Sequence, residues 1–135
     1  MNEILRQVKA LSLPPGDYAI FGSGPLLVRG VIDSVNDIDI ICRGTAWEKG
    51  KAIGELVHLD EYDVDVIAID DGRITLGRSW GIGSFDVQQL IDSAEEIDGL
   101  PFVLLQHVIE YKTIAGRPKD RQHLAALAAS KTAAD

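Results

Sequence analysis

Hydrophobic residues recur at helical spacing near the start of the chain and then give way to short runs typical of strands. Residues 2–12 carry apolar side chains at that spacing, which predicts an amphipathic helix ending before Pro14. Residues 18–21 form an apolar run of strand type that stops at a Gly-Ser-Gly-Pro sequence, residues 22–25. We expect a second helix to begin there and to end near Gly30, because proline is favoured in the first turn of a helix.

The middle of the chain alternates polar and apolar residues with a period of two, which is typical of half-buried strands. The alternation covers residues 37–41 and residues 63–69. An Asp-Asp-Gly turn at residues 70–72 follows, and residues 74–76 are expected to pair back as a hairpin strand. Two further segments complete this region, a predicted helix over residues 45–54 and a short strand over residues 55–59.

The last part of the sequence is predicted to be helical. Helices are expected over residues 85–95, around residues 105–109 before a break at Gly116 and Pro118, and over the alanine-rich residues 119–133. This order of elements predicts an α/β (α+β) domain with a small mixed β-sheet flanked by helices. We expect residues 1–135 to form one domain, with the C-terminal helices of residues 104–134 packed on it.

The composition is that of an ordinary globular protein, since 46% of the 135 residues are hydrophobic and 25% are charged. A single cysteine, Cys42, excludes an internal disulfide bond. No apolar run is long enough for a secretory signal or a membrane span, so a cytoplasmic protein without a membrane partner is expected.

Charge is distributed unevenly along the chain. The 13 basic and 21 acidic residues give a net charge of −8, which argues against non-specific nucleic-acid binding. Residues 1–111 hold 8 basic and 19 acidic side chains, whereas residues 112–135 hold 5 basic and 2 acidic ones. This separation is compatible with a metal site that faces an anion clamp, or with a solvated acidic loop beside an ordinary basic helix.

Gly22 and Ser23 follow a predicted strand and precede a predicted helix. Free backbone N–H groups at a helix start, together with a serine hydroxyl, can bind phosphate. The sequence is neither a Walker A loop nor a complete dinucleotide fingerprint, because Leu27 stands at the third glycine position. The alternative is a strand-to-helix turn that needs glycine only for its backbone angles.

Asp37 and Asp39 are two positions apart on a predicted strand, so their carboxylates project from the same face, about 6–7 Å apart along the chain. Such a pair repels unless a cation joins it, and Mg²⁺ is the natural partner of hard oxygen ligands. A third carboxylate is expected from a neighbouring strand, where Asp63 and Asp65 both qualify and Asp65 lies deeper in the apolar run. Carboxylates that simply face solvent are the alternative.

These pieces together resemble the DNA polymerase β-like nucleotidyltransferase superfamily, in particular its minimal bacterial members. The family pattern is an apolar strand ending in Gly-Ser, a short helix, an Asp-x-Asp strand and a later strand aspartate. The corresponding segments here are residues 20–23, 34–40 and 64–66, with a family-like tail at Lys112 and residues 117–120. The resemblance covers about residues 17–70 and implies a nucleotidyltransferase fold.

The resemblance implies that Gly22 and Ser23 hold the terminal phosphates of a nucleotide. It also implies that Asp37 and Asp39 ligate two Mg²⁺ ions, and that Asp65 completes this metal site and activates an acceptor hydroxyl. Two-metal chemistry of this kind lowers the pKa of the attacking oxygen and stabilises the pyrophosphate leaving group.

Two cations are further candidates for nucleotide binding. Minimal members often carry an arginine soon after Gly-Ser, where this chain has apolar residues 24–27, and Arg29 could replace it from one turn later. Lys112 lies on an otherwise apolar helix face, from which it could reach a triphosphate. A lysine that merely extends its charge to solvent is the alternative.

The activity implied by the resemblance is transfer of a nucleoside monophosphate, AMP from ATP or its counterpart from another NTP, to a hydroxyl acceptor. A small domain favours an acceptor brought by a partner protein, as in minimal nucleotidyltransferases that act as antitoxins beside a helical toxin. The alternative is a catalytically idle nucleotide- or partner-binding module, which binds nucleotide without turnover. It is favoured if Asp63 and Asp65 both point away from the face of Asp37 and Asp39. A dinucleotide-binding fragment is disfavoured by Leu27.

Overall fold

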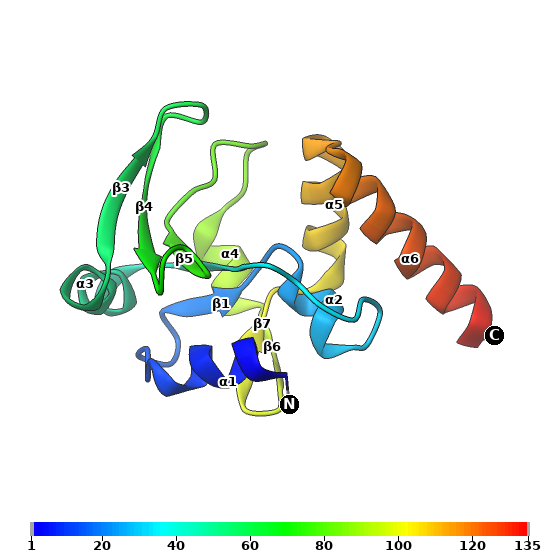
Figure 1. The fold of residues 1–135 in the computed structure, drawn as a ribbon, viewed down its shortest axis with the longest axis horizontal. Coiled ribbons are helices and arrows are strands. Elements are labelled where there is room, and N and C mark those ends of the chain that lie inside the picture. Colours follow the sequence, from blue (N-terminus) through cyan, green and yellow to red (C-terminus); the bar gives the residue numbers. More distant parts are fainter. Residues whose placement is uncertain (1, 135) are drawn as a thin grey trace.

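The computed structural model describes the backbone of residues 2–134 and the side chains of residues 2–130 (Figure 1). One mixed sheet has seven strands in the order β3-β4-β5-β2-β1-β7-β6. The strands are β1 (Tyr18–Ile20), β2 (Ile38–Cys42), β3 (Glu55–Leu59), β4 (Val64–Ile69), β5 (Ile74–Gly77), β6 (Glu95–Ile97) and β7 (Leu100–Phe102). The helices are α1 (Glu3–Ala10), α2 (Gly24–Val28), α3 (Gly44–Ile53), α4 (Val87–Asp92), α5 (Leu105–Ala115) and α6 (Pro118–Ala134). The predicted mixed sheet with flanking helices is therefore confirmed.

β2 occupies the centre of the sheet, antiparallel to β1 and parallel to β5. In this register Asp39 lies beside Thr75 of β5, and Ile40 lies between Ile20 and Leu76. β5 is antiparallel to β4, which in turn is antiparallel to the edge strand β3. The two carboxylates predicted on β2 thus lie next to the β3–β4–β5 part of the sheet.

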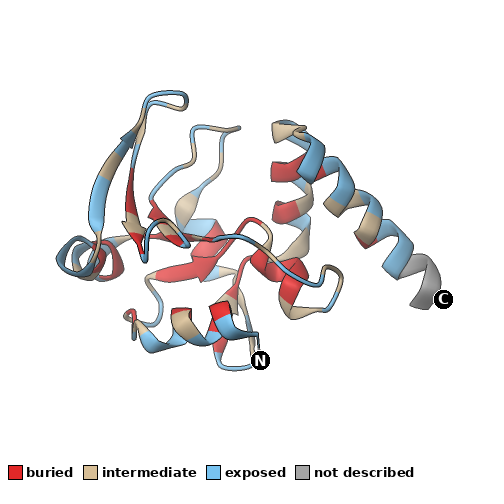
Figure 2. Cartoon of the chain, viewed as in Figure 1, coloured by how far each residue is buried: buried red, intermediate tan, exposed pale blue. Residues whose placement is uncertain are grey.

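Each face of the sheet is covered by its own hydrophobic core. Figure 2 shows the buried residues of the strands and helices in red. On one face Ile38 and Ile40 of β2 belong to a core that includes residues of α1 and α3. On the other face Ile41 and Phe21 belong to a core that includes residues of α4 and α5. Because successive residues of a strand point to opposite faces, Asp39 shares the α5 face with Ile41.

The helices agree with the predicted order, but one of them is shorter than expected. The helix predicted over residues 85–95 is α4, which begins after Asp86 because that carboxylate caps the N–H groups of Gln88 and Gln89. Among the described residues no helix is both long and apolar enough to cross a membrane.

The hairpin of β6 and β7 was not predicted from the sequence. Its two-residue turn consists of Asp98 and Gly99, which both adopt positive φ angles, 54° and 82°. An Asp-Gly pair of this kind is a strong hairpin signal, because such turns require a left-handed backbone at both positions. β7 pairs with β1 through Ile20 and Phe102 and extends the sheet beyond the predicted strands.

Candidate functional site

A cleft of about 310 Å³ opens on the α5 face of the sheet, at the C-terminal helix pair. Residues of β2, β3, β4 and β5 line it, together with residues of the adjoining loops and of α5 and α6. Its lining includes Asp37, Asp39, Val57, Leu59, Tyr62, Val66, Ala68, Thr75, Trp80, Ile82, Tyr111, Arg117 and Lys119. The cleft therefore combines two carboxylates, two cations and three aromatic rings.

Asp37 and Asp39 both lie in this cleft, Asp37 exposed just before β2 and Asp39 half-buried within the strand. Burial, together with the charge of Asp37, raises the pKa of Asp39 from 3.8 to about 6. Lys119, Arg117 and Lys112 oppose this rise. A nearby cation would stabilise the ionised form of Asp39, since it would offset both the cost of burial and the repulsion from Asp37.

Gly22 lies directly against Asp39, because a Cβ atom added at position 22 would come within 2.9 Å of Asp39 Oδ2. Its φ of +59° is also a conformation that side chains rarely adopt. The preceding residue, Phe21, donates its N–H to the Asp39 carbonyl at 2.8 Å and fixes the bend against β2. A side chain at position 22 would therefore displace the Asp39 carboxylate, in addition to straining the turn.

Ser23 is bound to the C-terminal helices by a partly buried polar cluster that also contains Lys112, Asp120 and His123, which we call the Lys112 cluster. Lys112 Nζ donates to Ser23 Oγ at 3.0 Å and to Asp120 Oδ1 at 3.4 Å, and lies 3.1 Å from His123 Nδ1. The ring nitrogen is also 3.1 Å from Ser23 Oγ. Lys112 and Asp120 are 1% and 0% exposed, so this cluster fixes α5, α6 and the Gly-Ser bend to one another.

Burial, together with the charges in the cluster, shifts the pKa values of its members. Burial lowers the pKa of the Lys112 ammonium, although Asp120 acts in the opposite direction. Burial tends to raise the pKa of Asp120, but its hydrogen bonds from Arg117 outweigh that effect and hold the pKa below 3.8. Burial and the neighbouring Lys112 lower the pKa of His123. His123 is consequently neutral near pH 7.

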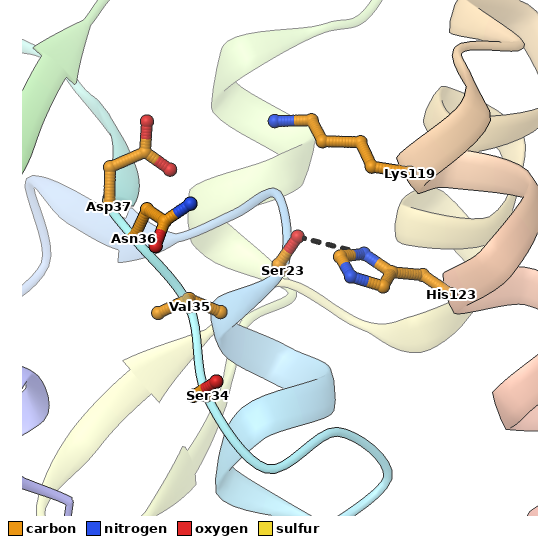
Figure 3. Close-up of a pocket in the computed structure, with 7 residues that line it drawn as sticks. All are labelled: Ser23, Ser34, Val35, Asn36, Asp37, Lys119 and His123. Atoms are coloured by element: carbon orange, nitrogen blue, oxygen red, sulfur yellow. Dashed lines mark hydrogen bonds between the residues drawn. The ribbon is translucent and has the colours of Figure 1, made fainter.

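A second, polar hollow of about 200 Å³ lies beside the cleft and shares Asp37 and Lys119 with it. Its other lining residues are Ser23, Ser34, Val35, Asn36 and His123 (Figure 3). In Figure 3 Lys119 and His123 extend from α6 toward the Gly-Ser bend and the segment before β2. The site thus has an aromatic side and a polar side, with Asp37 and Lys119 common to both.

Asp65 does not join Asp37 and Asp39. It has the same strand parity as Ile67 and Ile69, which belong to the core on the opposite face of the sheet. Its side chain is bound to His58 Nδ1 at 2.8 Å on the adjacent strand. Asp63 lies in the β3–β4 turn, with its carboxylate 3.3 Å from His58 Nε2.

The β4 residues that do face the cleft are Val66 and Ala68, and Thr75 faces it from β5. Within the described part of the chain, no group of three or more His, Cys, Asp or Glu side chains is arranged to hold a metal ion. Metal ligation in this cleft would therefore rest on Asp37 and Asp39 together with oxygen atoms of a ligand. The predicted third carboxylate is not among them.

Arg29 also lies away from the cleft. Its guanidinium is bound to Glu95 of β6 and to the Pro25 carbonyl, at the C-terminal end of α2. α2 has five residues, which is too short to provide the helix-start anion site expected after Ser23. In the structure the cations that line the cleft are Arg117 and Lys119, at the start of α6.

Several site residues carry little or no local signal in the sequence. Lys119 belongs to the family-like tail of residues 117–120, at a helix start where a cation opposes the helix dipole. Tyr62, Trp80 and His123 belong to no motif, and His123 is 100 residues away from the serine that it contacts. Only the fold brings them to the Gly-Ser bend and to the carboxylates.

No protein-family model, curated protein sequence or solved structure matches this chain. The function is therefore inferred from the residues of the cleft.

Proposed function

We propose that this protein is an Mg²⁺-dependent nucleotidyltransferase with a nucleotidyltransferase fold, which transfers a nucleoside monophosphate, AMP from ATP, to a hydroxyl acceptor. The observation that supports this is the pair Asp37 and Asp39, which open into one cleft opposite Arg117 and Lys119. Carboxylates facing cations across a cleft suit a ligand that is itself an anion carrying a divalent cation.

The residues present suit Mg²⁺. Asp37 and Asp39 supply hard oxygen donors, and Mg²⁺ is commonly held by one or two carboxylates plus the phosphate oxygens of its substrate. The raised pKa of Asp39 indicates a carboxylate that a bound cation would stabilise in its ionised form. Bound Mg²⁺ would neutralise phosphate charge and polarise the phosphoryl group.

The protein's own residues would bind and orient the nucleotide. Lys119 and Arg117 would offset the negative charge that accumulates on pyrophosphate as it leaves. Tyr62, Trp80 and Tyr111 would cover the apolar part of the substrate and exclude water. In the transfer, the acceptor oxygen bonds to the α-phosphorus, the bond to pyrophosphate breaks, and the hydroxyl proton is released.

A second candidate is a nucleotide- or partner-binding module that does not transfer, of the antitoxin-like kind. The position of Asp65 favours it, because no third carboxylate from β4 faces the cleft. Such a module would bind nucleotide with Mg²⁺ but would release no pyrophosphate. Both candidate functions therefore predict Mg²⁺-dependent nucleotide binding, but only the nucleotidyltransferase predicts turnover.

The test compares three single variants, Asp37→Asn, Asp39→Asn and Asp65→Asn. We expect the first two to lower Mg²⁺-dependent transfer of α-³²P label from ATP into a host lysate by about 100-fold or more, the scale of losing a charge-stabilising group. Asp65→Asn is the matched control, since Asp65 lies on the other face, and it should retain the activity of the unmodified protein.

Each outcome selects one assignment. Label transfer that survives Asp37→Asn and Asp39→Asn would reject the site. Loss of transfer in Asp65→Asn would show that Asp65 belongs to the catalytic site. Mg²⁺-dependent ATP binding by calorimetry, without label transfer or pyrophosphate release, would select the idle module.

A further inference from the structure

The Lys112 cluster constrains where its hydrogen atoms lie. A lysine ammonium has three N–H donors and cannot accept a hydrogen bond. Lys112 Nζ has three partners within hydrogen-bond distance, namely Ser23 Oγ, Asp120 Oδ1 and His123 Nδ1. Its donors are therefore all used within the protein, and at 1% exposure it has no path to a ligand.

The same contacts determine the tautomer of His123. Because Lys112 can only donate, His123 Nδ1 must be an acceptor and carries no hydrogen. The proton of the neutral ring then lies on Nε2. The Ser23 hydroxyl, 3.1 Å from Nδ1, competes for the same lone pair and does not alter this conclusion.

The Nε2–H group of His123 is available to a ligand. The hydrogen bonds found among the described residues engage this ring through Nδ1, while the side chain lines the polar hollow (Figure 3). Lys119, Asn36 and the hydroxyl of Ser34 line the same hollow of about 200 Å³. Hydrogen-bond donors thus make up most of the lining, and Asp37 lies at the side that the hollow shares with the cleft.

We propose that His123 is a phosphate-binding residue, whose Nε2–H donates to an oxygen of the nucleotide's phosphate chain, and that Lys112 is a positioning residue that sets this tautomer instead of binding phosphate itself. This inference rests on the proposed function, because it assigns the polar hollow to the phosphate chain of the same substrate. It reassigns the role that the sequence suggested for Lys112 and gives a role to a histidine outside any motif.

Two substitutions separate phosphate binding from a purely structural role. In His123→Asn the amide oxygen can replace Nδ1 as the acceptor for Lys112, but nothing reaches the position of Nε2. In His123→Gln the amide nitrogen can reach the Nε2 position, but the acceptor beside Lys112 is lost. Calorimetry with inorganic tripolyphosphate in the presence of Mg²⁺ measures the effect without requiring turnover.

We expect His123→Asn to weaken tripolyphosphate binding about tenfold or more, the scale of one hydrogen bond to a charged group, and His123→Gln to weaken it less. A structural role predicts the reverse order. If His123→Asn binds as tightly as the unmodified protein, while that protein binds Mg²⁺–ATP, the role of His123 is overturned and the proposed function stands. If the unmodified protein binds neither Mg²⁺–ATP nor tripolyphosphate, the proposed function fails and the inference fails with it.

A second measurement uses the unmodified chain and does not depend on how the variants fold. Long-range ¹H–¹⁵N NMR spectra of the imidazole should show His123 as the neutral tautomer with hydrogen on Nε2, and tripolyphosphate should shift the Nε2 resonance. Hydrogen on Nδ1, or a resonance that does not respond to saturating tripolyphosphate, would overturn the proposal.

Discussion

Gly22 is the residue at which backbone conformation and site chemistry coincide. We expect Gly22→Ala to lower the free energy of unfolding by about 1–3 kcal/mol through backbone strain, because its φ is +59°. It should also abolish Mg²⁺–ATP binding, since the added Cβ would lie 2.9 Å from Asp39 Oδ2. Urea unfolding and calorimetry measure the two effects.

Gly30→Ala is the matched control for this substitution. Gly30 has a similar φ of +74°, but a Cβ there meets no atom within 4 Å. It should lose comparable stability and keep its nucleotide affinity. Equal losses of affinity in both variants would show that Gly22 has no special relation to the carboxylate.

Asp39 should make the stability of the metal-free protein depend on pH. Its pKa is 3.8 when unperturbed and about 6 in the folded state, so the folded protein binds the proton more tightly. The contribution of Asp39 to the free energy of unfolding is therefore greatest below pH 4, and it falls by about 2–3 kcal/mol as the pH rises through 6.

Asp39→Asn removes this titration. With EDTA present, we expect the variant to be more stable than the unmodified protein at pH 7 and to lose that advantage near pH 4. Urea unfolding at several pH values measures the difference between the two proteins. A difference that does not change with pH would contradict the burial assigned to Asp39.

At the scale of elements, β2 was predicted correctly and the orientation of β4 was not. Charged and apolar residues alternate over residues 37–40, at the start of β2, so the sequence defines the face of Asp39. In β4 the alternation expected over residues 63–69 ends at Asp65, because residues 66–69 are all apolar. Ile67 packs in one core, while Val66 and Ala68 line the cleft on the other face. Apolar side chains on both faces remove the alternation that would have placed Asp65.

The pairing of α5 and α6 depends on Asp120, which is fully buried and accepts hydrogen bonds from Arg117 and Lys112. We expect Asp120→Ala to lower the free energy of unfolding by about 3–5 kcal/mol, because it leaves the Lys112 ammonium buried without a counter-charge. Urea unfolding is the measurement.

The double variant Lys112→Met/Asp120→Ala, compared with the single variants Lys112→Met and Asp120→Ala, provides the control. It removes both charges, so it should lose less stability than the sum of the two single variants. Additive losses would mean that the two side chains do not interact.

At the scale of the whole molecule, the separation of charge along the sequence corresponds to an arrangement in space. The chain is acidic before residue 112 and basic after it, and the basic start of α6 brings Arg117 and Lys119 to the cleft of Asp37 and Asp39. The mixed sheet with flanking helices, apart from the β6–β7 hairpin, and the shared face of the carboxylate pair were predictable, since they depend on local patterns. The contact of His123 with Ser23 was not, since it depends on how separate elements pack.

The aromatic side of the cleft leads to the last prediction. If the phosphate chain occupies the polar hollow, the base extends toward Tyr62, Trp80 and Tyr111. Stacking of a base on an aromatic side chain contributes about 1–3 kcal/mol. We therefore expect Tyr62→Ala to weaken Mg²⁺–ATP binding about five- to 100-fold and to leave tripolyphosphate binding unchanged.

Tyr62→Phe keeps the ring and should bind both ligands as the unmodified protein does. Calorimetry on the two variants with the two ligands separates the possible roles of the ring. Equal weakening of ATP and tripolyphosphate in Tyr62→Ala would assign the ring to the stability of the β3–β4 turn. Unchanged ATP binding would indicate that the aromatic side of the cleft binds the acceptor and not the base. The acceptor would then lie next to the phosphate chain, because the aromatic and polar sides share Asp37 and Lys119, where transfer would take place.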